Sequence, residues 1–284
     1  MTSYSFDRPR YWTRVAVVVA VGWLSGFVGS LSAAAQEARS VKAKYEVSYA
    51  GVSIGDFTFN SRIDGSSYTI NSATSIKLLF GALKWSSRSV SRGNIRKTVA
   101  PEAFEFNYRS NRKAFRSAIR FARGDVAELS NRPPLKKSSK RVALKPEHLK
   151  NVMDPMSAIM AMTLGVKRNP CQGSVDVFEG RMRFKLALEA KGQRRIQERG
   201  NSGQPRLGAV CRIRFTPIAG YKRSKAMRDM ANNRNIEVVL RPVPDANLFV
   251  PYLITVPTGY GTVTIASRRV EIIDGRRQRI ALSH

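Results

Sequence analysis

Short runs of alternating apolar and polar residues, separated by turn signals, constrain the fold of this chain most strongly. In residues 44–49, Tyr45, Val47 and Tyr49 alternate with polar residues, and Asp64-Gly65 is a hairpin signal. The alternation begins at Lys42 and recurs along the chain. It has the period of a half-buried strand, and many short strands joined by turns favour an antiparallel sheet. We therefore predict a mainly β protein whose antiparallel sheet is curved or forms a partly open β-barrel.

One short core helix is predicted near residues 154–165. Asp154 is a suitable N-cap residue, and Pro155 suits the first helical position. Met156 and Met160 follow at helical spacing, and Gly165 is a plausible stop. The methionine-rich stripe has two interpretations, namely plain core packing or contact with an apolar ligand, to which methionine adapts its shape.

The first 35 residues have the order of a secretory signal peptide. A basic start is followed by the uncharged run Val15–Leu31 and then by Ser32-Ala33-Ala34-Ala35-Gln36. A retained transmembrane anchor is the alternative, but the run is short and three glycines interrupt it. We predict cleavage near Ala35, a periplasmic location with no retained transmembrane segment, and a single β-rich domain over residues 36–284.

The chain is strongly basic, with a net charge of +29. The predicted signal peptide contains three arginines and one aspartate, so its removal leaves +27. Such a charge either attracts polyanions or is a solvated basic surface without a specific partner. For an exported protein the polyanions are anionic lipid, lipopolysaccharide or an acidic envelope protein, and we expect no nucleic acid. Residues 132–150 form a predicted basic loop, which is either simply solvated or an anion contact. Its candidate anion contacts are Lys136, Lys137, Lys140 and Arg141.

The two cysteines, Cys171 and Cys211, are predicted to form a disulfide. Exported thiols tend to pair in an oxidising compartment. A bridge closing so long a loop contributes about 4 kcal/mol in the chain-entropy description. Two unpaired thiols are the alternative, and a zinc site would need further ligands.

The order of several short motifs resembles a bacterial exported family of domains of unknown function, numbered 3108. The resemblance covers residues 41–270 and implies an exported, β-rich protein without an established activity. Glu179 stands where an aspartate is expected in the family's turn. By fold analogy, the architecture is similar to curved half-barrels that carry lipids or lipoproteins through the periplasm. The motifs are Tyr45-Glu46-Val47-Ser48-Tyr49 with Gly51 and Gly55, Asp154-Pro155-Met156-Ser157-Ala158, Cys171 with Val177-Phe178-Glu179-Gly180-Arg181, Cys211 with Pro217-Ile218-Ala219-Gly220-Tyr221, Val250-Pro251-Tyr252 and Tyr260-Gly261-Thr262.

The sequence contains no recognisable catalytic or metal-binding constellation. Its only histidines are His148, in the basic loop, and His284, the last residue printed. Neither a phosphate-binding Gly-rich loop nor a Gly-x-Ser-x-Gly nucleophile motif is present. We therefore expect no enzyme, no cofactor and no metal.

Two functions from different classes remain. The first is a binding module for a lipid-like or anionic envelope ligand, held in the concave face of the sheet. The second is a structural or scaffolding protein that binds a periplasmic partner protein through loops or a strand edge. An apolar cavity inside the sheet favours the first, and a filled core the second. The candidate apolar ligand-facing residues are Phe57, Phe59, Phe104, Phe106, Phe115, Phe121, Met156 and Met160.

Overall fold

The computed structural model describes residues 39–78, 82–136, 138–165 and 169–284. The chain divides into two compact units, Met1–Ala34 and Ala35–His284, and every described residue belongs to the second. The predicted signal peptide and Lys137 lie outside the described residues.

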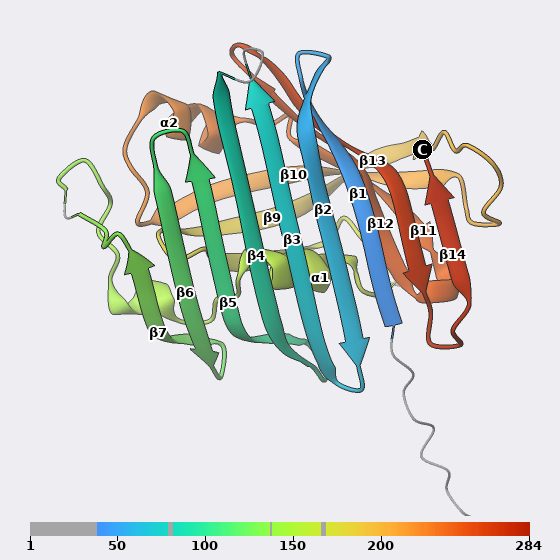
Figure 1. The fold of residues 1–284 in the computed structure, drawn as a ribbon, viewed down its shortest axis with the longest axis horizontal. Coiled ribbons are helices and arrows are strands. Elements are labelled where there is room, and N and C mark those ends of the chain that lie inside the picture. Colours follow the sequence, from blue (N-terminus) through green and yellow to red (C-terminus); the bar gives the residue numbers. More distant parts are fainter. Residues whose placement is uncertain (1–38, 79–81, 137, 166–168) are drawn as a thin grey trace, which may run out of the picture. The chain divides into compact units, whose positions relative to one another are not determined.

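Fourteen antiparallel strands form one large sheet (Figure 1). Its order is β7-β6-β5-β4-β3-β2-β1-β13-β12-β11-β10-β9-β8, and β14 pairs with β13 beside this path. The strands are β1 (Arg39–Tyr49), β2 (Val52–Asp64), β3 (Ser67–Leu78), β4 (Leu83–Ile95), β5 (Val99–Ser110), β6 (Ala114–Ala122), β7 (Asp125–Arg132), β8 (Gly173–Phe178), β9 (Arg183–Arg195), β10 (Leu207–Ala219), β11 (Glu237–Val243), β12 (Leu248–Thr258), β13 (Gly261–Ile273) and β14 (Arg279–Ser283). The predicted mainly β, antiparallel fold is confirmed. The first strand begins at Arg39, before the predicted Lys42.

The sheet is curved but does not close into a barrel by strand pairing between β7 and β8. The segment before the first helix bridges these two ends instead. Val152 donates its amide to the Gly124 carbonyl in the β6–β7 turn at 2.9 Å. Its neighbour Met153 exchanges backbone hydrogen bonds with β8, donating to Asp176 at 3.0 Å and accepting from Phe178 at 2.9 Å. Strand pairing along the sheet and the connector at residues 152–153 therefore both maintain its curvature.

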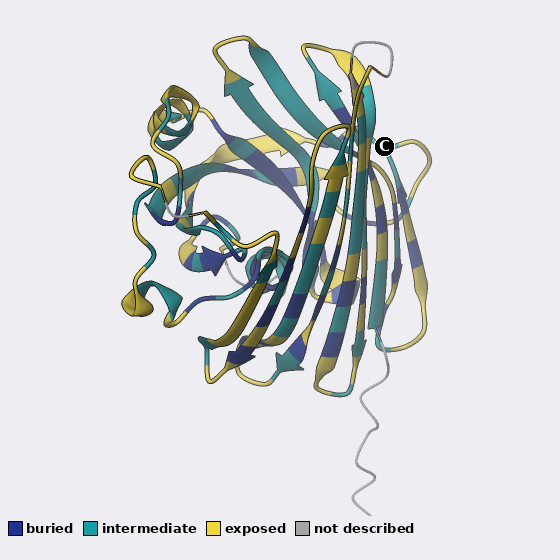
Figure 2. Cartoon of the chain, turned by 60° about the vertical axis from the view of Figure 1, so that its left-hand side comes forward, coloured by how far each residue is buried: buried dark blue, intermediate teal, exposed yellow. Residues whose placement is uncertain are grey.

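Helix α1 (Pro155–Thr163) follows this connector and lies on the concave side of the sheet, as Figure 2 shows in a view turned from that of Figure 1. Its predicted start is confirmed, because Asp154 accepts hydrogen bonds from the Met156 and Ser157 amides at 2.9 and 3.0 Å. The helix is apolar on almost every side, which is typical of a helix surrounded by other elements. Within the described residues, the other helical elements are α2 (Lys225–Asn232) and the 3-10 turns η2 (Pro146–Leu149) and η3 (Pro244–Ala246).

The predicted basic loop is held to the rest of the fold at its centre. Val142 donates to the Tyr221 carbonyl at 3.0 Å and accepts from the Gly220 amide at 2.9 Å. The Arg141 guanidinium donates to the Gly220 carbonyl at 2.7 Å. These contacts align residues 138–142 with residues 220–223.

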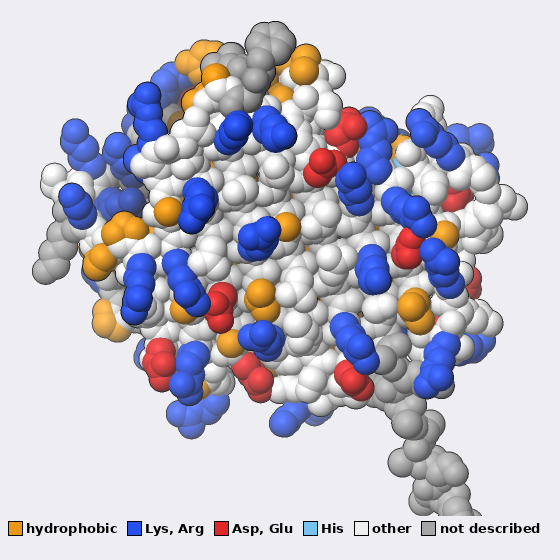
Figure 3. Space-filling model, in the orientation of Figure 1, with side chains coloured by type: hydrophobic (Ala, Val, Ile, Leu, Met, Phe, Trp, Pro, Cys, Tyr) orange, Lys and Arg blue, Asp and Glu red, His pale blue; other side chains and the backbone are white. Residues whose placement is uncertain are grey.

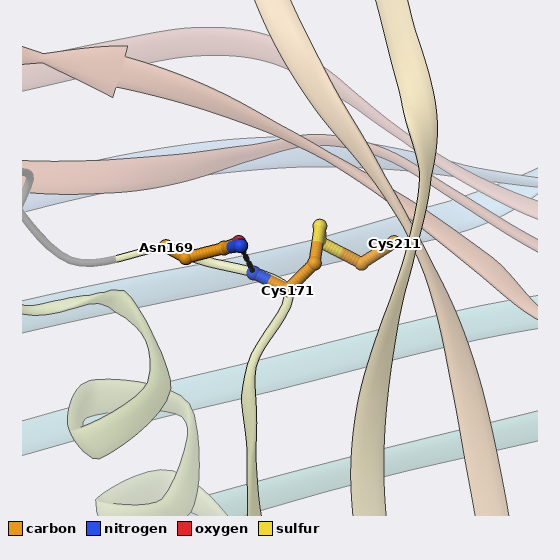
Figure 4. The surroundings of a disulfide bond; sticks show 3 residues. All are labelled: Asn169, Cys171 and Cys211. Carbon is orange, nitrogen blue, oxygen red and sulfur yellow. Dashed lines mark hydrogen bonds between the residues drawn. A yellow bond between two sulfur atoms is a disulfide. The ribbon is translucent and has the colours of Figure 1, made fainter.

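The predicted disulfide is confirmed, and it joins Cys171, just before β8, to Cys211 in β10 (Figure 4). The two Cα atoms lie 5.1 Å apart, and both residues are buried among Leu188, Val238 and Leu240. The Cys171 amide donates to the Asn169 side-chain oxygen at 3.0 Å. The bridge closes a separation of 40 residues and holds the start of the edge strand β8 against the interior of the sheet.

Candidate functional site

An apolar cavity of about 490 Å³ lies between α1 and the concave face of the sheet. Its volume lies within the usual range of small-molecule sites, about 300–1,000 Å³. Strands β1 to β4, β12 and β13 supply its walls, and α1 supplies the opposite side. Its lining includes Tyr45, Phe57, Phe59, Met160, Phe249 and Ile265.

Strand alternation explains the apolar wall. In β1, Val41, Ala43, Tyr45 and Val47 share the concave face, and the intervening residues point outward. The register pairs Ala43 with Phe59 and Tyr45 with Phe57, so β2 continues the same face. The rings of Tyr45 and Phe57 lie 5.7 Å apart between centroids, a favourable distance for an aromatic pair.

Tyr45 adds one polar group to this apolar wall. The residue is only 5% exposed, and its hydroxyl has no hydrogen-bond partner among the described residues. Burial raises the pKa of the Tyr45 phenol far above its ordinary value, so this group stays neutral. A neutral, unpartnered hydroxyl is available to hydrogen-bond a polar group that enters the cavity.

The cavity exists because α1 packs closely against only part of the concave face. Met160 packs with Tyr68 and Ile70 of β3, and Ala158 packs with Val175 and Val177 of β8. The side of α1 that carries Ile159, Thr163 and Leu164 faces β1, β12 and β13 across the cavity.

The structure separates the eight predicted apolar ligand-facing residues into two groups. Phe57, Phe59 and Met160 line the cavity. The other five do not, although the four phenylalanines among them share the concave face. They pack with neighbouring protein side chains: Phe104, Phe106, Phe121 and Met156 against Val152 and Phe178, and Phe115 against Tyr108 and the Arg181 guanidinium.

The predicted anion contacts do not meet this cavity. Lys136 and Lys140 are exposed, and Arg141 is half-buried with its side chain committed to the Gly220 carbonyl. Lys140 and Arg141 lie beside the 220–223 segment, and none of the three residues is part of the cavity lining.

A buried polar network fixes the start of α1 on the sheet. Besides capping the helix, the Asp154 carboxylate accepts hydrogen bonds from the hydroxyls of Ser91 in β4, at 3.0 Å, and Ser157. The Ser157 hydroxyl also lies 2.7 Å from the hydroxyl of Tyr68 in β3. Asp154, Ser91 and Ser157 are fully buried. Since solvent does not reach these groups, the network acts as a structural anchor for the helix.

Glycine at position 93 makes room for the tyrosine of this network. Gly93 lies directly opposite Tyr68 in the β3–β4 register. A Cβ atom there would stand 2.6 Å from the Tyr68 hydroxyl and 2.2 Å from the Ala100 carbonyl oxygen.

Burial is the main cause that raises the pKa of Tyr68 to about 12, and burial also raises the pKa of Asp154.

Residues 44–266 match the family described as "Protein of unknown function (DUF3108)". The chain belongs to this family. The matched region of DUF3108 contains α1, its anchor and most of the cavity wall, and it excludes Arg39 at the start of β1 and all of β14. The chain matches no curated protein and no solved structure.

Sequence reasoning missed a second buried polar cluster, around Arg241 in β11. This arginine is fully buried and pairs with the buried Glu198 carboxylate at 3.0 Å. Its guanidinium also donates to Nε2 of His284 at 2.9 Å, and the His284 Nδ1 lies 3.0 Å from the Ser267 hydroxyl. Burial is the main cause that lowers the pKa of His284 to about 4, with the Arg241 charge adding to it.

This second cluster joins β11 and β13 to the loop around residue 198 and does not line the apolar cavity. The sequence did contain a signal for it, because Arg241 interrupts the apolar run Val238–Val243. A charge within such a run requires a buried partner.

Among the ranges given above, no helix is long and apolar enough to cross a membrane. No group of three or more His, Cys, Asp or Glu side chains is placed to hold a metal ion within those same ranges.

We predict that Asp154→Ala lowers the free energy of unfolding by about 3 kcal/mol, because two helix amides and two hydroxyls lose their acceptor. Asp154→Asn, the matched control, retains an amide oxygen as acceptor and costs less. Urea unfolding followed by circular dichroism measures both. An alanine variant as stable as the wild type would contradict the anchor.

The variants Asp154→Ala and Asp154→Asn also test how titration of the Asp154 carboxyl affects stability. Because burial raises the folded-state pKa above the ordinary value of 3.8, the folded state binds the proton more tightly than the unfolded state. The contribution of the protonated Asp154 carboxyl to the free energy of unfolding is therefore lost as the pH rises through the folded-state pKa. Asp154→Asn should lack this part of the pH dependence.

Proposed function

We propose that this DUF3108 protein is a binding protein, and not an enzyme, that holds a lipid-like apolar ligand between α1 and the concave face of its sheet. The observation that carries the proposal is the apolar cavity of about 490 Å³. A scaffold that used only loops or strand edges would have no need of such a space. The Asp154 anchor supports the proposal, because it holds α1 at one end and leaves the cavity beside its apolar side.

We further propose that the protein acts in the periplasm after cleavage near Ala35. The reasons are those of the sequence, namely the order of basic, apolar and small residues before Gln36. The disulfide supports this location, since structural disulfides persist in oxidising compartments.

The outer face of the sheet supplies a surface for an anionic envelope partner. Figure 3 shows lysine and arginine side chains spread over the face formed by β1 to β7, with fewer acidic ones between them. A shallow hollow of about 840 Å³ crosses this region, bordered by Arg88, Arg109, Arg116 and Arg132. Arg116 pairs with Glu105 at 2.9 Å, whereas the other three arginines make no ion pair with any described residue.

The cationic surface and the apolar cavity together favour anionic lipid or lipopolysaccharide over an acidic envelope protein as the partner. Lipids would provide both negative head groups for the arginines of the outer face and apolar chains for the cavity on the concave face.

We predict that the purified protein retains lipid-like molecules in native mass spectrometry and binds an uncharged, polarity-sensitive naphthylamine dye. Ala43 lies on the cavity wall with little exposure, so Ala43→Phe should fill part of the space and weaken dye binding about tenfold or more. The matched control is Ala73→Phe on the outer face of β3, which should bind normally. Absence of both retained lipid and dye binding in the wild type would refute the cavity function.

We also predict that the protein floats with vesicles containing phosphatidylglycerol and is released as the salt concentration approaches about 1 M, where the Debye length is only about 3 Å. Arg88→Glu with Arg109→Glu should reduce flotation. The control pair Arg194→Glu with Arg195→Glu, at the exposed end of β9, changes the net charge equally. Equal loss with both pairs would mean that net charge alone, and not the outer face, drives binding.

A further inference from the structure

Arg39 brings a positive charge to an otherwise uncharged cavity. It is the first residue of β1 and shares the concave face with Val41, Ala43 and Tyr45. Among the described residues that line the cavity, Arg39 is the only one with a charged side chain. The cavity therefore has one cationic end, near Arg39 and Ile273, and an uncharged remainder that extends along β1 to Val47.

The Arg39 guanidinium has no counterion among the described residues. The residue is half-buried, and none of the described residues gives its side chain a hydrogen bond or an ion pair. A guanidinium is always charged and carries five donors in a planar fork. Removing such a group from water without a partner costs free energy, so a half-buried site of this kind favours an anion.

Arg39 also lies between the apolar cavity and a second, more polar hollow. A second hollow of about 550 Å³ is lined by Lys97, Gln172 and other polar residues as well as apolar ones. Arg39, Leu164 and Phe249 line both this hollow and the apolar cavity. A ligand with an apolar chain in the first space would thus reach a polar, cationic environment at Arg39.

We propose that the ligand is an anionic single-chain amphiphile, whose oxyanionic head group pairs with Arg39 and whose acyl chain lies along β1 toward Val47. This inference rests on the proposed function of the cavity. The arginine fork matches both carboxylate and phosphate oxygens, which are the two sources of this head-group chemistry.

The dimensions fit this assignment. Eight residue steps from Arg39 to Val47 span about 26 Å at about 3.3 Å per residue. Half of the hydrocarbon core of a bilayer, the depth that one acyl chain fills, is about 15 Å. The wall of β1 is therefore long enough for one extended chain, with the head group at Arg39.

Displacement of the uncharged naphthylamine dye by palmitate, palmitoyl lysophosphatidate and hexadecanol tests the proposal. The three probes have the same chain length and differ in the head group. We expect the wild type to bind at least one of the two anions about tenfold more tightly than hexadecanol, since charge-assisted hydrogen bonds are worth at least that factor. Whichever anion binds more tightly identifies the head-group chemistry, carboxylate or phosphate.

Arg39→Gln should abolish this preference and leave affinity for the dye and for hexadecanol unchanged, while Arg39→Lys should retain part of it. The matched control, Arg194→Gln at the exposed end of β9, should behave as the wild type. Unchanged dye binding also shows that the variant is folded.

The outcomes distinguish this inference from the function on which it rests. Equal affinity of the wild type for hexadecanol and both anions, or a full preference for the anions in Arg39→Gln, would overturn the role of Arg39 and leave the cavity function intact. Failure of all three probes and of the dye to bind the wild type would overturn the cavity function itself.

Discussion

The hydrogen bonds of the buried Asp154 carboxylate are the interaction on which the rest of this structure depends. One oxygen caps α1 through the Met156 and Ser157 amides, and the other accepts from the Ser91 and Ser157 hydroxyls. A helix that is apolar on almost every side would otherwise lower its free energy by burying as much surface as the sheet allows. The polar anchor restricts where it can pack, because any shift would leave a buried carboxylate without partners.

The cavity follows from this restriction. The anchored start of α1 lies against β3, β4 and β8, where side chains fill the interior. The wall made by β1, β2, β12 and β13 curves past the other side of the helix, and small side chains such as Ala43 and Ser61 line part of it. The disulfide holds the start of β8, the strand on which Ala158 packs, against β10. The anchored helix and the strands of the concave face thus enclose an apolar space.

Much of the sheet could be predicted from the sequence, because the alternation of apolar and polar residues along a strand depends only on neighbouring residues. The alternation identified Phe57, Phe59 and Phe104 as members of apolar strand faces. It did not separate the first two, which line the cavity, from Phe104, which packs on Phe178, because that difference depends on where α1 lies. The position of α1 depends in turn on contacts such as Ser91 with Asp154, separated by 63 residues.

The roles of Arg241 and Arg39 could be predicted from the sequence to different extents. Arg241 interrupts an apolar strand, so its sequence environment alone calls for a buried partner, although not for Glu198 in particular. Arg39 precedes the first clear alternation and is one of many basic residues in the chain. Only the register of β1 with β2 and β13 places it at the end of an apolar cavity.

The most direct test of a ligand cavity between α1 and the sheet is a crystal structure of the protein grown with a fatty acid that carries bromine on its chain. Anomalous scattering locates the bromine without reference to the protein coordinates. We predict a single bromine peak between β1 and α1, close to Tyr45 and Phe57, with the dye-binding site blocked by the same ligand. A cavity filled by protein side chains, with bromine absent or bound only on the outer surface, would contradict the account.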